Sequence, residues 1–249
     1  MRKLREGLLY IGFLRVAFSV SSLVLAFTLS WILLANMNFL YPIWHDIGGI
    51  GQGIDKFGPQ NQFKAGFGDT SPSQRAELFA HINQAIHQHG QGLSEISYET
   101  PTSNGPQLML REPEITHLQD VANLIDVLRV FVVINGIIWC VLGYVIIKMP
   151  RRVVFWPSQI GGVVGSIALV SILVLLIGPV KVFNQLHIWI FPKDNQWFFY
   201  YQESLMSTLM LAPTVFAWIA GALTIVGILF FASLLTGTVL LEGKAKNTP

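Results

Sequence analysis

Charged side chains are scarce in this chain of 249 residues: Asp, Glu, Lys and Arg make up only 12% of it, whereas 52% is hydrophobic. A soluble globular domain carries about a quarter charged residues, so this scarcity excludes an ordinary soluble protein. Cysteine is scarcer still. The single Cys140 excludes an internal disulfide, and its place within an apolar run predicts a buried, unreactive thiol.

Several catalytic fingerprints are also missing from the sequence. It contains no G-x-S-x-G nucleophile elbow, no P-loop, no H-E-x-x-H metal motif and no G-x-G-x-x-G dinucleotide loop. Serine-based hydrolysis and nucleotide chemistry therefore have no support, and we expect no nucleotide and no other cofactor. The net charge of +2 gives no indication of a nucleic-acid partner.

The sequence does contain four apolar runs, each long enough to cross the hydrocarbon core of a bilayer, which takes about 20 helical residues. They cover Leu8–Leu34, Val121–Ile147, Ile160–Val182 and Leu209–Leu241. The first run is too long for the apolar part of a signal peptide and is followed by aromatic side chains, which is typical of a retained anchor. We therefore predict an α-helical integral membrane protein with a four-helix transmembrane bundle.

Lysine and arginine predict the orientation of this bundle. They cluster before the first span, between the second and third, and after the fourth. Under a four-span topology these places share one side, which the positive-inside rule assigns to the cytoplasm. The predicted division is a cytoplasmic N-terminus with the first helix (1–34), an extracytoplasmic cap (35–120), two helices (121–182) joined by a cytoplasmic turn (148–159), an extracytoplasmic aromatic loop (183–208), and a last helix with a cytoplasmic tail (209–249).

The long outer segment predicts a small α+β cap. It opens with a glycine-rich stretch at 48–60 that favours a loop. A helix follows, because Ser71 and Gln74 form a capping box and Gly90 stops the apolar stripe behind them. Two short β-like runs on either side of an Asn-Gly turn then predict a hairpin: Ile96–Glu99 and Gln107–Leu110.

Two histidines, His117 and His187, are brought by this topology to the outer membrane–water interface. His117 precedes the second span and His187 follows the third. An ionisable pair at that depth is a candidate for function. Thr116 and Gln119 predict a second capping box, which would put His117 at the first helical position. The helix dipole disfavours imidazolium there and would keep the ring neutral, as a general base requires.

Polar neighbours are candidates to orient these imidazoles. Asp120 lies three residues after His117, on the same face of the predicted helix. Glu114 and Asn184 are each close in sequence to one of the two histidines, although spacing alone singles out neither. The alternative is that all of these residues are polar groups at wet helix ends.

Asp126 and Arg129 form another pair with the same spacing, inside the second span. Burial of either charge alone is expensive, so we expect a structural or interfacial ion pair, or an arginine that anchors a lipid phosphate.

The remaining histidines include His81, His87 and His89 on the predicted cap helix. At about 100° per residue these positions point in different directions, so we expect a solvated helix surface and no metal site.

The stretch REPEITHLQDV, from Arg111 to Val121, resembles the acidic-x-x-His-x-x-Asp-Val signature of a family of bacterial four-span membrane proteins. The stretch from Phe183 to Phe216 is similar to the second signature of that family, with a histidine, an aromatic-rich run, a tryptophan and a proline before the last span. It departs from the pattern in having Ile190 where many members have phenylalanine. The characterised members are lipoprotein intramolecular transacylases of the Lit type.

This resemblance implies a reaction, a location and a site. A transacylase of this type moves the sn-2 acyl chain of an S-diacylglyceryl cysteine to the α-amine of that cysteine, which leaves a lyso-form lipoprotein. The two signature histidines map onto His117 and His187, which would be catalytic. The place would be the bacterial inner membrane, and the partners would be membrane lipids and a diacylglyceryl-lipoprotein substrate.

Elementary chemistry is compatible with this reaction. An α-amine has a pKa near 8, so its attack on an ester is helped by a base, and the leaving alkoxide then needs a proton. Two imidazoles can divide these tasks, and nucleophile and ester already belong to one molecule. The alternatives are a non-catalytic binding or scaffold protein whose cap docks a partner, and a metal-dependent enzyme that uses the outer histidines.

Overall fold

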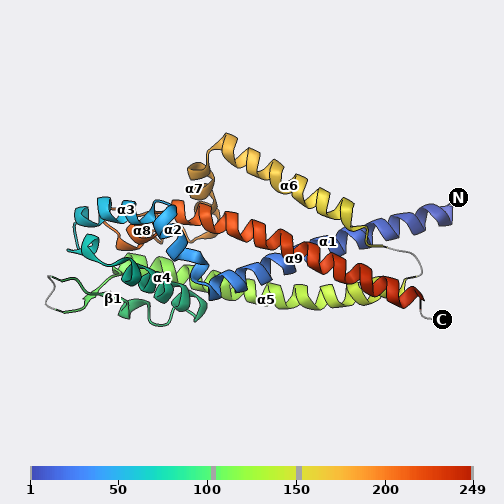
Figure 1. Cartoon of the computed structure of the whole chain (residues 1–249), viewed down its shortest axis with the longest axis horizontal. Coiled ribbons are helices and arrows are strands. Elements are labelled where there is room, and N and C mark those ends of the chain that lie inside the picture. Colours follow the sequence, from blue (N-terminus) through green and yellow to red (C-terminus); the bar gives the residue numbers. More distant parts are fainter. Residues whose placement is uncertain (1, 102–104, 150–152, 248–249) are drawn as a thin grey trace. The chain divides into compact units, whose positions relative to one another are not determined.

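The computed structural model describes residues 2–101, 105–149 and 153–247 of the chain. Its four long helices are α1 (Arg2–Asn36), α5 (Glu112–Lys148), α6 (Trp156–Ile177) and α9 (Thr214–Asn247) (Figure 1). Each is long and apolar enough to cross a membrane. The predicted class, an α-helical membrane protein with four candidate transmembrane helices, is therefore confirmed.

Shorter elements complete the described chain. In chain order they are η1 (Asn38–Leu40), α2 (Tyr41–Ile47), α3 (Ile50–Phe57), η2 (Gly58–Gln60), η3 (Phe67–Asp69), α4 (Pro72–His87), η4 (Leu93–Glu95), β1 (Ser97–Tyr98), β2 (Gln107–Leu108), α7 (Pro179–Ile190) and α8 (Leu205–Met210), where η denotes a 3₁₀ helix.

Two predicted span boundaries were wrong. The third span was expected to run to Val182, but α6 ends at Ile177, because Gly178 has a φ of +103° and Pro179 starts the separate helix α7. The fourth was expected to begin at Leu209. That residue lies instead in α8, and the last long helix starts only after Pro213. The predicted aromatic loop at 183–208 is thus partly helical.

The chain folds as two compact units. The first consists of Met1–Leu33, Arg129–Leu176 and Ala222–Pro249, and the second of Leu34–Leu128 and Ile177–Gly221. The first unit therefore holds most of the length of the four long helices, whereas the second holds the short elements together with the ends of α1, α5 and α9.

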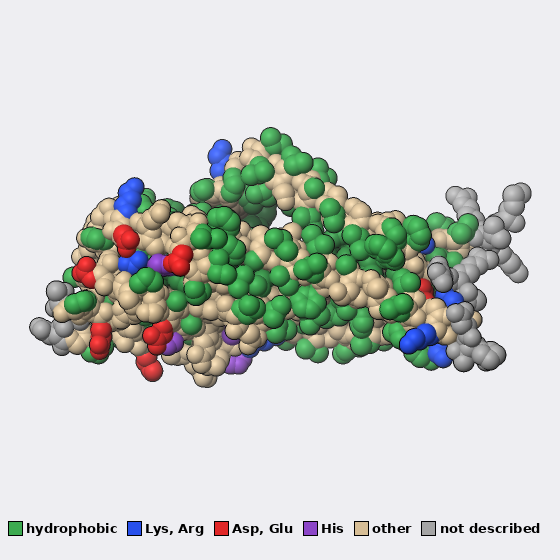
Figure 2. Space-filling view, viewed as in Figure 1, with side chains coloured by type: hydrophobic (Ala, Val, Ile, Leu, Met, Phe, Trp, Pro, Cys, Tyr) green, Lys and Arg blue, Asp and Glu red, His purple; other side chains and the backbone are tan. Residues whose placement is uncertain are grey.

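Within the first unit, polar side chains on neighbouring helices are bonded to one another. Ser21 Oγ lies 3.0 Å from Asn135 Oδ1, and the indole of Trp139 donates to Ser22 Oγ at 2.9 Å. Such bonds satisfy polar groups that lipid cannot. Elsewhere the helices present apolar side chains, which cover much of the visible face in Figure 2. Cys140, predicted to be buried, is exposed, because this unit leaves its face of α5 uncovered.

The second unit confirms the predicted helix and hairpin of the α+β segment. Ser71 Oγ accepts a hydrogen bond from the Gln74 amide at 3.2 Å, and α4 begins at Pro72 as expected. Strands β1 and β2 pair antiparallel, with Ser97 opposite Leu108. Asn104, half of the predicted turn, lies outside the described residues. Helices α2, α3, α4 and α8 pack together here (Figure 1).

The glycine-rich stretch at 48–60 was expected to be a loop and is instead largely helical, in α3 and η2. Its glycines allow close packing rather than flexibility. A Cβ at Gly53 would lie 2.4 Å from Leu211 Cδ1, and one at Gly51 would lie 2.8 Å from the ring of His45. Composition alone could not distinguish this use of glycine from a loop.

Candidate active site

The second unit brings together two imidazoles that are 70 positions apart in the sequence. His117 on α5 and His187 on α7 have ring centroids 5.9 Å apart, with an angle of 34° between the ring planes. Both residues lie in this one compact unit. Of all the candidate residues chosen from sequence, these two are the pair whose rings the fold brings next to each other.

Local sequence explains how each helix presents its histidine. Pro179 fixes the start of α7, and His187 lies in the last turn of that helix. Helix α5 starts earlier than predicted. The Arg111 carbonyl accepts from the amides of Glu114 (2.9 Å) and Ile115 (3.0 Å), so the helix begins at Glu112 and His117 lies in its second turn. The expectation that His117 occupies the first helical position was wrong. A dipole effect confined to the first turn therefore does not explain a neutral ring there.

Aromatic rings surround both imidazoles. Those of Phe183, Trp197 and Phe191 have centroids 4.2, 5.1 and 5.2 Å from that of His187. Phe191 also meets His117 edge-on at 4.9 Å, and Phe199 lies 6.1 Å away. His117 keeps only 7% of its side chain exposed. The site is thus a largely apolar setting in which water competes weakly for the two rings.

The tautomer of His187 follows from a single contact. Its Nδ1 lies 2.8 Å from the carbonyl oxygen of Phe183. A carbonyl only accepts, so Nδ1 carries the proton and donates it, and in the neutral ring the lone pair is on Nε2. Burial lowers the pKa of His187 below its ordinary 6.5, against the opposing effect of the bond to Phe183. At pH 7 the ring is therefore mainly neutral, with Nε2 available to accept a proton.

His117 is the more deeply buried of the two and has an unsatisfied atom. Its Nδ1 has no hydrogen-bond partner within the described part of the chain. A buried polar atom left unpaired costs about 1–3 kcal/mol, and such atoms in a native protein call for an explanation. A substrate group that bonds to this nitrogen during the reaction would provide one.

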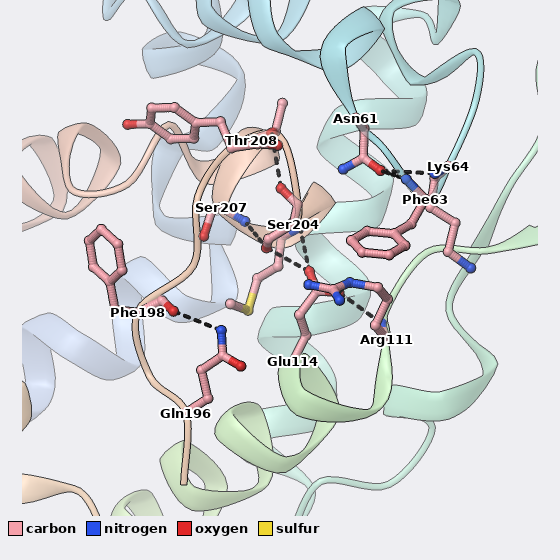
Figure 3. Close-up of polar contacts among 12 residues, drawn as sticks. Asn61, Phe63, Lys64, Arg111, Glu114, Gln196, Phe198, Ser204, Ser207 and Thr208 are labelled. Atoms are coloured by element: carbon pink, nitrogen blue, oxygen red, sulfur yellow. Dashed lines mark hydrogen bonds and ion pairs between the residues drawn. The ribbon is translucent and has the colours of Figure 1, made fainter.

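The carboxylates predicted to orient the imidazoles bond to other groups. Asp120 Oδ2 accepts from the side-chain Nδ2 of Asn195 at 2.7 Å. Glu114, which is fully buried, accepts from Ser204 Oγ at 2.6 Å, from the Met206 amide at 3.2 Å and from the Arg111 amide at 2.8 Å. Figure 3 shows the Glu114 carboxylate lying between Arg111 and Ser204. Both acids therefore hold neighbouring chain segments in place.

The other candidate residues take no part in the contact between the two rings. Asn184 lies on α7 and makes no side-chain hydrogen bond with the described residues. Asp126 pairs with His89 Nδ1 at 2.7 Å, a partner that its sequence spacing did not indicate. Arg129 is exposed on α5. The described residues contain no cluster of three His, Cys, Asp or Glu side chains that could hold a metal ion.

Sequence reasoning missed Asn195 as a member of the site. It also did not identify which rings of the aromatic run would contact the imidazoles. The many aromatic residues that follow His187 in the sequence could have indicated these ring contacts. No local pattern marks Asn195, because its partner Asp120 is 75 positions away.

This combination defines a class of protein. The chain combines four candidate transmembrane helices with two neighbouring imidazoles, one on the long helix α5 and the other, which has a defined tautomer, on the short helix α7. Such a pair is typical of a membrane-integral enzyme that uses acid–base catalysis. The family can now be given. A family model described as "Lipoprotein intramolecular transacylase Lit" matches residues 76–216, more than half of the chain and a range that contains both histidines. The chain belongs to this family.

A solved structure has the same fold. It is that of a variant of the membrane-integral lipoprotein intramolecular transacylase Lit from Bacillus cereus, to which this chain is 18% identical. The match covers 98% of this chain and 94% of that one, with a TM-score of 0.61. At this level of identity the likeness is one of fold. No curated protein matches the sequence.

Proposed function

We propose that His117 and His187 catalyse the intramolecular transfer of an acyl chain from the glycerol of an S-diacylglyceryl cysteine to the α-amine of that cysteine. The observation that carries this proposal is the 5.9 Å separation of the two imidazoles, on different helices, in an aromatic setting. The family to which the chain belongs is named for this kind of reaction.

The reaction needs one net proton transfer, from the attacking nitrogen to the leaving oxygen. The amine forms the new C–N bond at the ester carbonyl, the C–O bond to glycerol breaks, and the amine proton ends on the glycerol oxygen. His187 accepts the proton at Nε2, because its Nδ1 proton is committed to the Phe183 carbonyl. His117 donates its ring N–H proton to the leaving oxygen while its other ring nitrogen receives the proton that His187 took up, so both rings end neutral.

Part of the rate comes from the substrate itself. Nucleophile and ester belong to one molecule, so the enzyme has to hold them in a reactive geometry but does not have to bring together two separate molecules. A covalent acyl-enzyme is unnecessary, which agrees with the absence of a nucleophile motif in the sequence.

We further propose that the site faces the outer side of a bacterial inner membrane, with membrane lipids and a diacylglyceryl-lipoprotein as partners. Basic residues support this orientation. Lys148 ends α5, and Lys244 and Lys246 lie in the last turn of α9, at the opposite helix ends from those joined to the second unit. The positive-inside rule assigns such ends to the cytoplasm.

Mass spectrometry of a reporter lipoprotein tests the reaction. The reporter is co-expressed with this protein in cells that otherwise leave the cysteine α-amine free, and its N-terminal lipopeptide is analysed. We expect an N-acyl, S-monoacylglyceryl species that is lost with His117→Ala and with His187→Ala. Loss of a general acid or base costs about 10²- to 10⁴-fold in rate.

His81→Ala is the matched control, since His81 is half exposed on α4 and lies outside the imidazole pair. This variant should keep full activity. An unchanged diacylglyceryl reporter, with the protein folded and present in the membrane, would overturn the transferase proposal. A binding or scaffold role would then be the better account.

A further inference from the structure

We propose that the hydrogen bond between Asn195 and Asp120 is a tether that holds an aromatic strap, defined here as Phe191–Ser204, against the two imidazoles. Asn195 and Asp120 are then positioning residues for acyl transfer, and neither is a catalytic residue. This inference rests on the proposed function of His117 and His187.

The strap supplies much of the wall around the imidazole pair. Its Phe191 ring contacts both imidazoles, with centroids 4.9 Å from His117 and 5.2 Å from His187. Trp197 lies 5.1 Å from His187, and Phe199 lies 6.1 Å from His117. Displacement of the strap would therefore expose both rings to water and widen the space in which the substrate ester has to be aligned.

Both ends of the strap are anchored. At its start, the Phe191 amide donates to the His187 carbonyl at 3.0 Å. At its end, Ser204 donates to the buried Glu114 carboxylate at 2.6 Å (Figure 3). Near that end the Gln202 carbonyl also accepts from the Gln62 amide at 2.8 Å.

The middle of the strap has a single polar anchor. Among the described residues, the side-chain Nδ2 of Asn195 makes the only hydrogen bond that joins the stretch 192–198 to another element. The neighbouring bonds stay within the strap, from the Asn195 backbone amide to Pro192 and from the Gln196 side chain to Phe198. Lys193 and Asp194 are exposed. Without the tether, only ring contacts hold this stretch in place.

The tether joins the strap to the helix that carries His117. Asp120 lies three residues after His117 on α5, so its carboxylate is fixed to the same rigid element as the imidazole. The 2.7 Å bond to a charged acceptor is of the strong, short kind. The bond therefore fixes the distance between the strap rings and His117. The substrate can be aligned with His117 only if this distance stays fixed.

An exchange of the two side chains tests this inference in a way that separates a tether from a charge effect. Asn195→Asp puts two carboxylates together and should break the tether. Asp120→Asn combined with Asn195→Asp restores one amide and one carboxylate with donor and acceptor exchanged. If Asp120 acted on His117 through its charge, the exchange would not help, because residue 120 would remain neutral.

Purified protein in lipid vesicles is assayed with a reporter diacylglyceryl lipopeptide. We expect Asn195→Asp to lower kcat by about 10- to 100-fold, because misplacement of about 1 Å can cost 10²-fold. KM should change by less than about threefold, since a KM rise alone would indicate lost ground-state binding. The double exchange should recover kcat to within about threefold of the unaltered chain.

Asp194→Asn is the matched control, since it removes an exposed carboxylate one position from the tether, and it should leave kcat unchanged. Full activity of Asn195→Asp, or a double exchange as slow as that single variant, would overturn the tether. The unaltered chain and His187→Ala are run in the same assay. Failure of the proposed function can therefore be distinguished from failure of the tether. If the proposed function is wrong, even the unaltered chain forms no N-acyl product.

Discussion

At the scale of single residues, the chemistry of the site depends on where two protons reside. His187 has a defined tautomer because its Nδ1 faces a carbonyl, and burial among aromatic rings lowers its pKa. His117 has no such partner for Nδ1 within the described chain. The two rings are therefore unequal, one with its proton committed to the backbone and the other open to a substrate contact. This inequality suits a pair in which one ring accepts a proton and the other delivers one.

The pH dependence of kcat/KM should show this arrangement. The α-amine of the substrate, with a pKa of about 8, must be neutral to attack, so log kcat/KM rises with a slope of one up to that pH. His187 must also be neutral to act as a base. Below the pKa of His187, a proton bound to this ring removes the base. The slope of log kcat/KM against pH then increases to at least two. Because burial lowers that pKa, the steepening should begin below pH 6.5.

Phe191→Ala provides the matched comparison for this pH profile. Removing a ring that touches both imidazoles admits water and weakens the effect of burial. The point at which the slope steepens should then move upward, toward pH 6.5. A profile that already steepens at or above pH 6.5 in the unaltered chain would contradict a buried neutral base.

At the scale of elements, Glu114 holds the start of α5 and binds both the end of the strap and the start of α8. The Glu114 carboxylate accepts from the Arg111 amide, from Ser204 Oγ and from the Met206 amide. The same residue therefore caps its own helix and fixes the start of α8. Its role in the fold is to join two elements that are 90 positions apart.

Glu114→Ala should consequently destabilise the second unit. The change leaves at least one buried donor unpaired, and each such group costs about 1–3 kcal/mol, so we expect a loss of about 3 kcal/mol in the free energy of unfolding. Thermal unfolding in detergent measures this. Glu112→Ala removes an exposed carboxylate from the same helix start and is the control. Equal stability of the two variants would contradict the joining role.

Prediction from sequence succeeded for elements whose signals are local. Apolar length predicted the four long helices, and Ser71 with Pro72 predicted the start of α4. It failed for the stretch at 48–60, where Gly53 packs against the distant Leu211, a contact that no window of sequence shows. It also misplaced the start of α5. The Glu114 cap on the Arg111 amide spans only three residues and competes locally with the Thr116–Gln119 capping box that was predicted instead.

The same distinction applies to the candidate site. His117 and His187 could be selected because membrane topology places them at one interface, a global constraint that hydropathy reveals. Their orienting partners could not be selected. Asp120 was a candidate to orient His117, three residues away, or to accept N–H groups near the helix start. It accepts instead from the Asn195 side chain, and that choice depends on the path of the strap.

At the scale of the whole molecule, the reaction requires that the site face the compartment in which lipoprotein cysteines are modified. Lys148, Lys244 and Lys246 favour a cytoplasmic location for the far ends of α5 and α9. The second unit would then be extracytoplasmic. This assignment makes a prediction that does not depend on activity, because each end of the helices can be labelled separately.

Cysteine labelling tests the orientation, starting from a Cys140→Ser background that removes the single native thiol. Gln91→Cys places a thiol on an exposed position of the second unit, and Ala245→Cys places one near the end of α9. A membrane-impermeant maleimide should label the first in intact spheroplasts and the second only after permeabilisation. The reverse pattern would place the imidazole pair on the cytoplasmic side, where a lipoprotein modified outside could not reach it. Equal labelling of both thiols in detergent is the control, since it shows that each is reactive once the membrane barrier is gone.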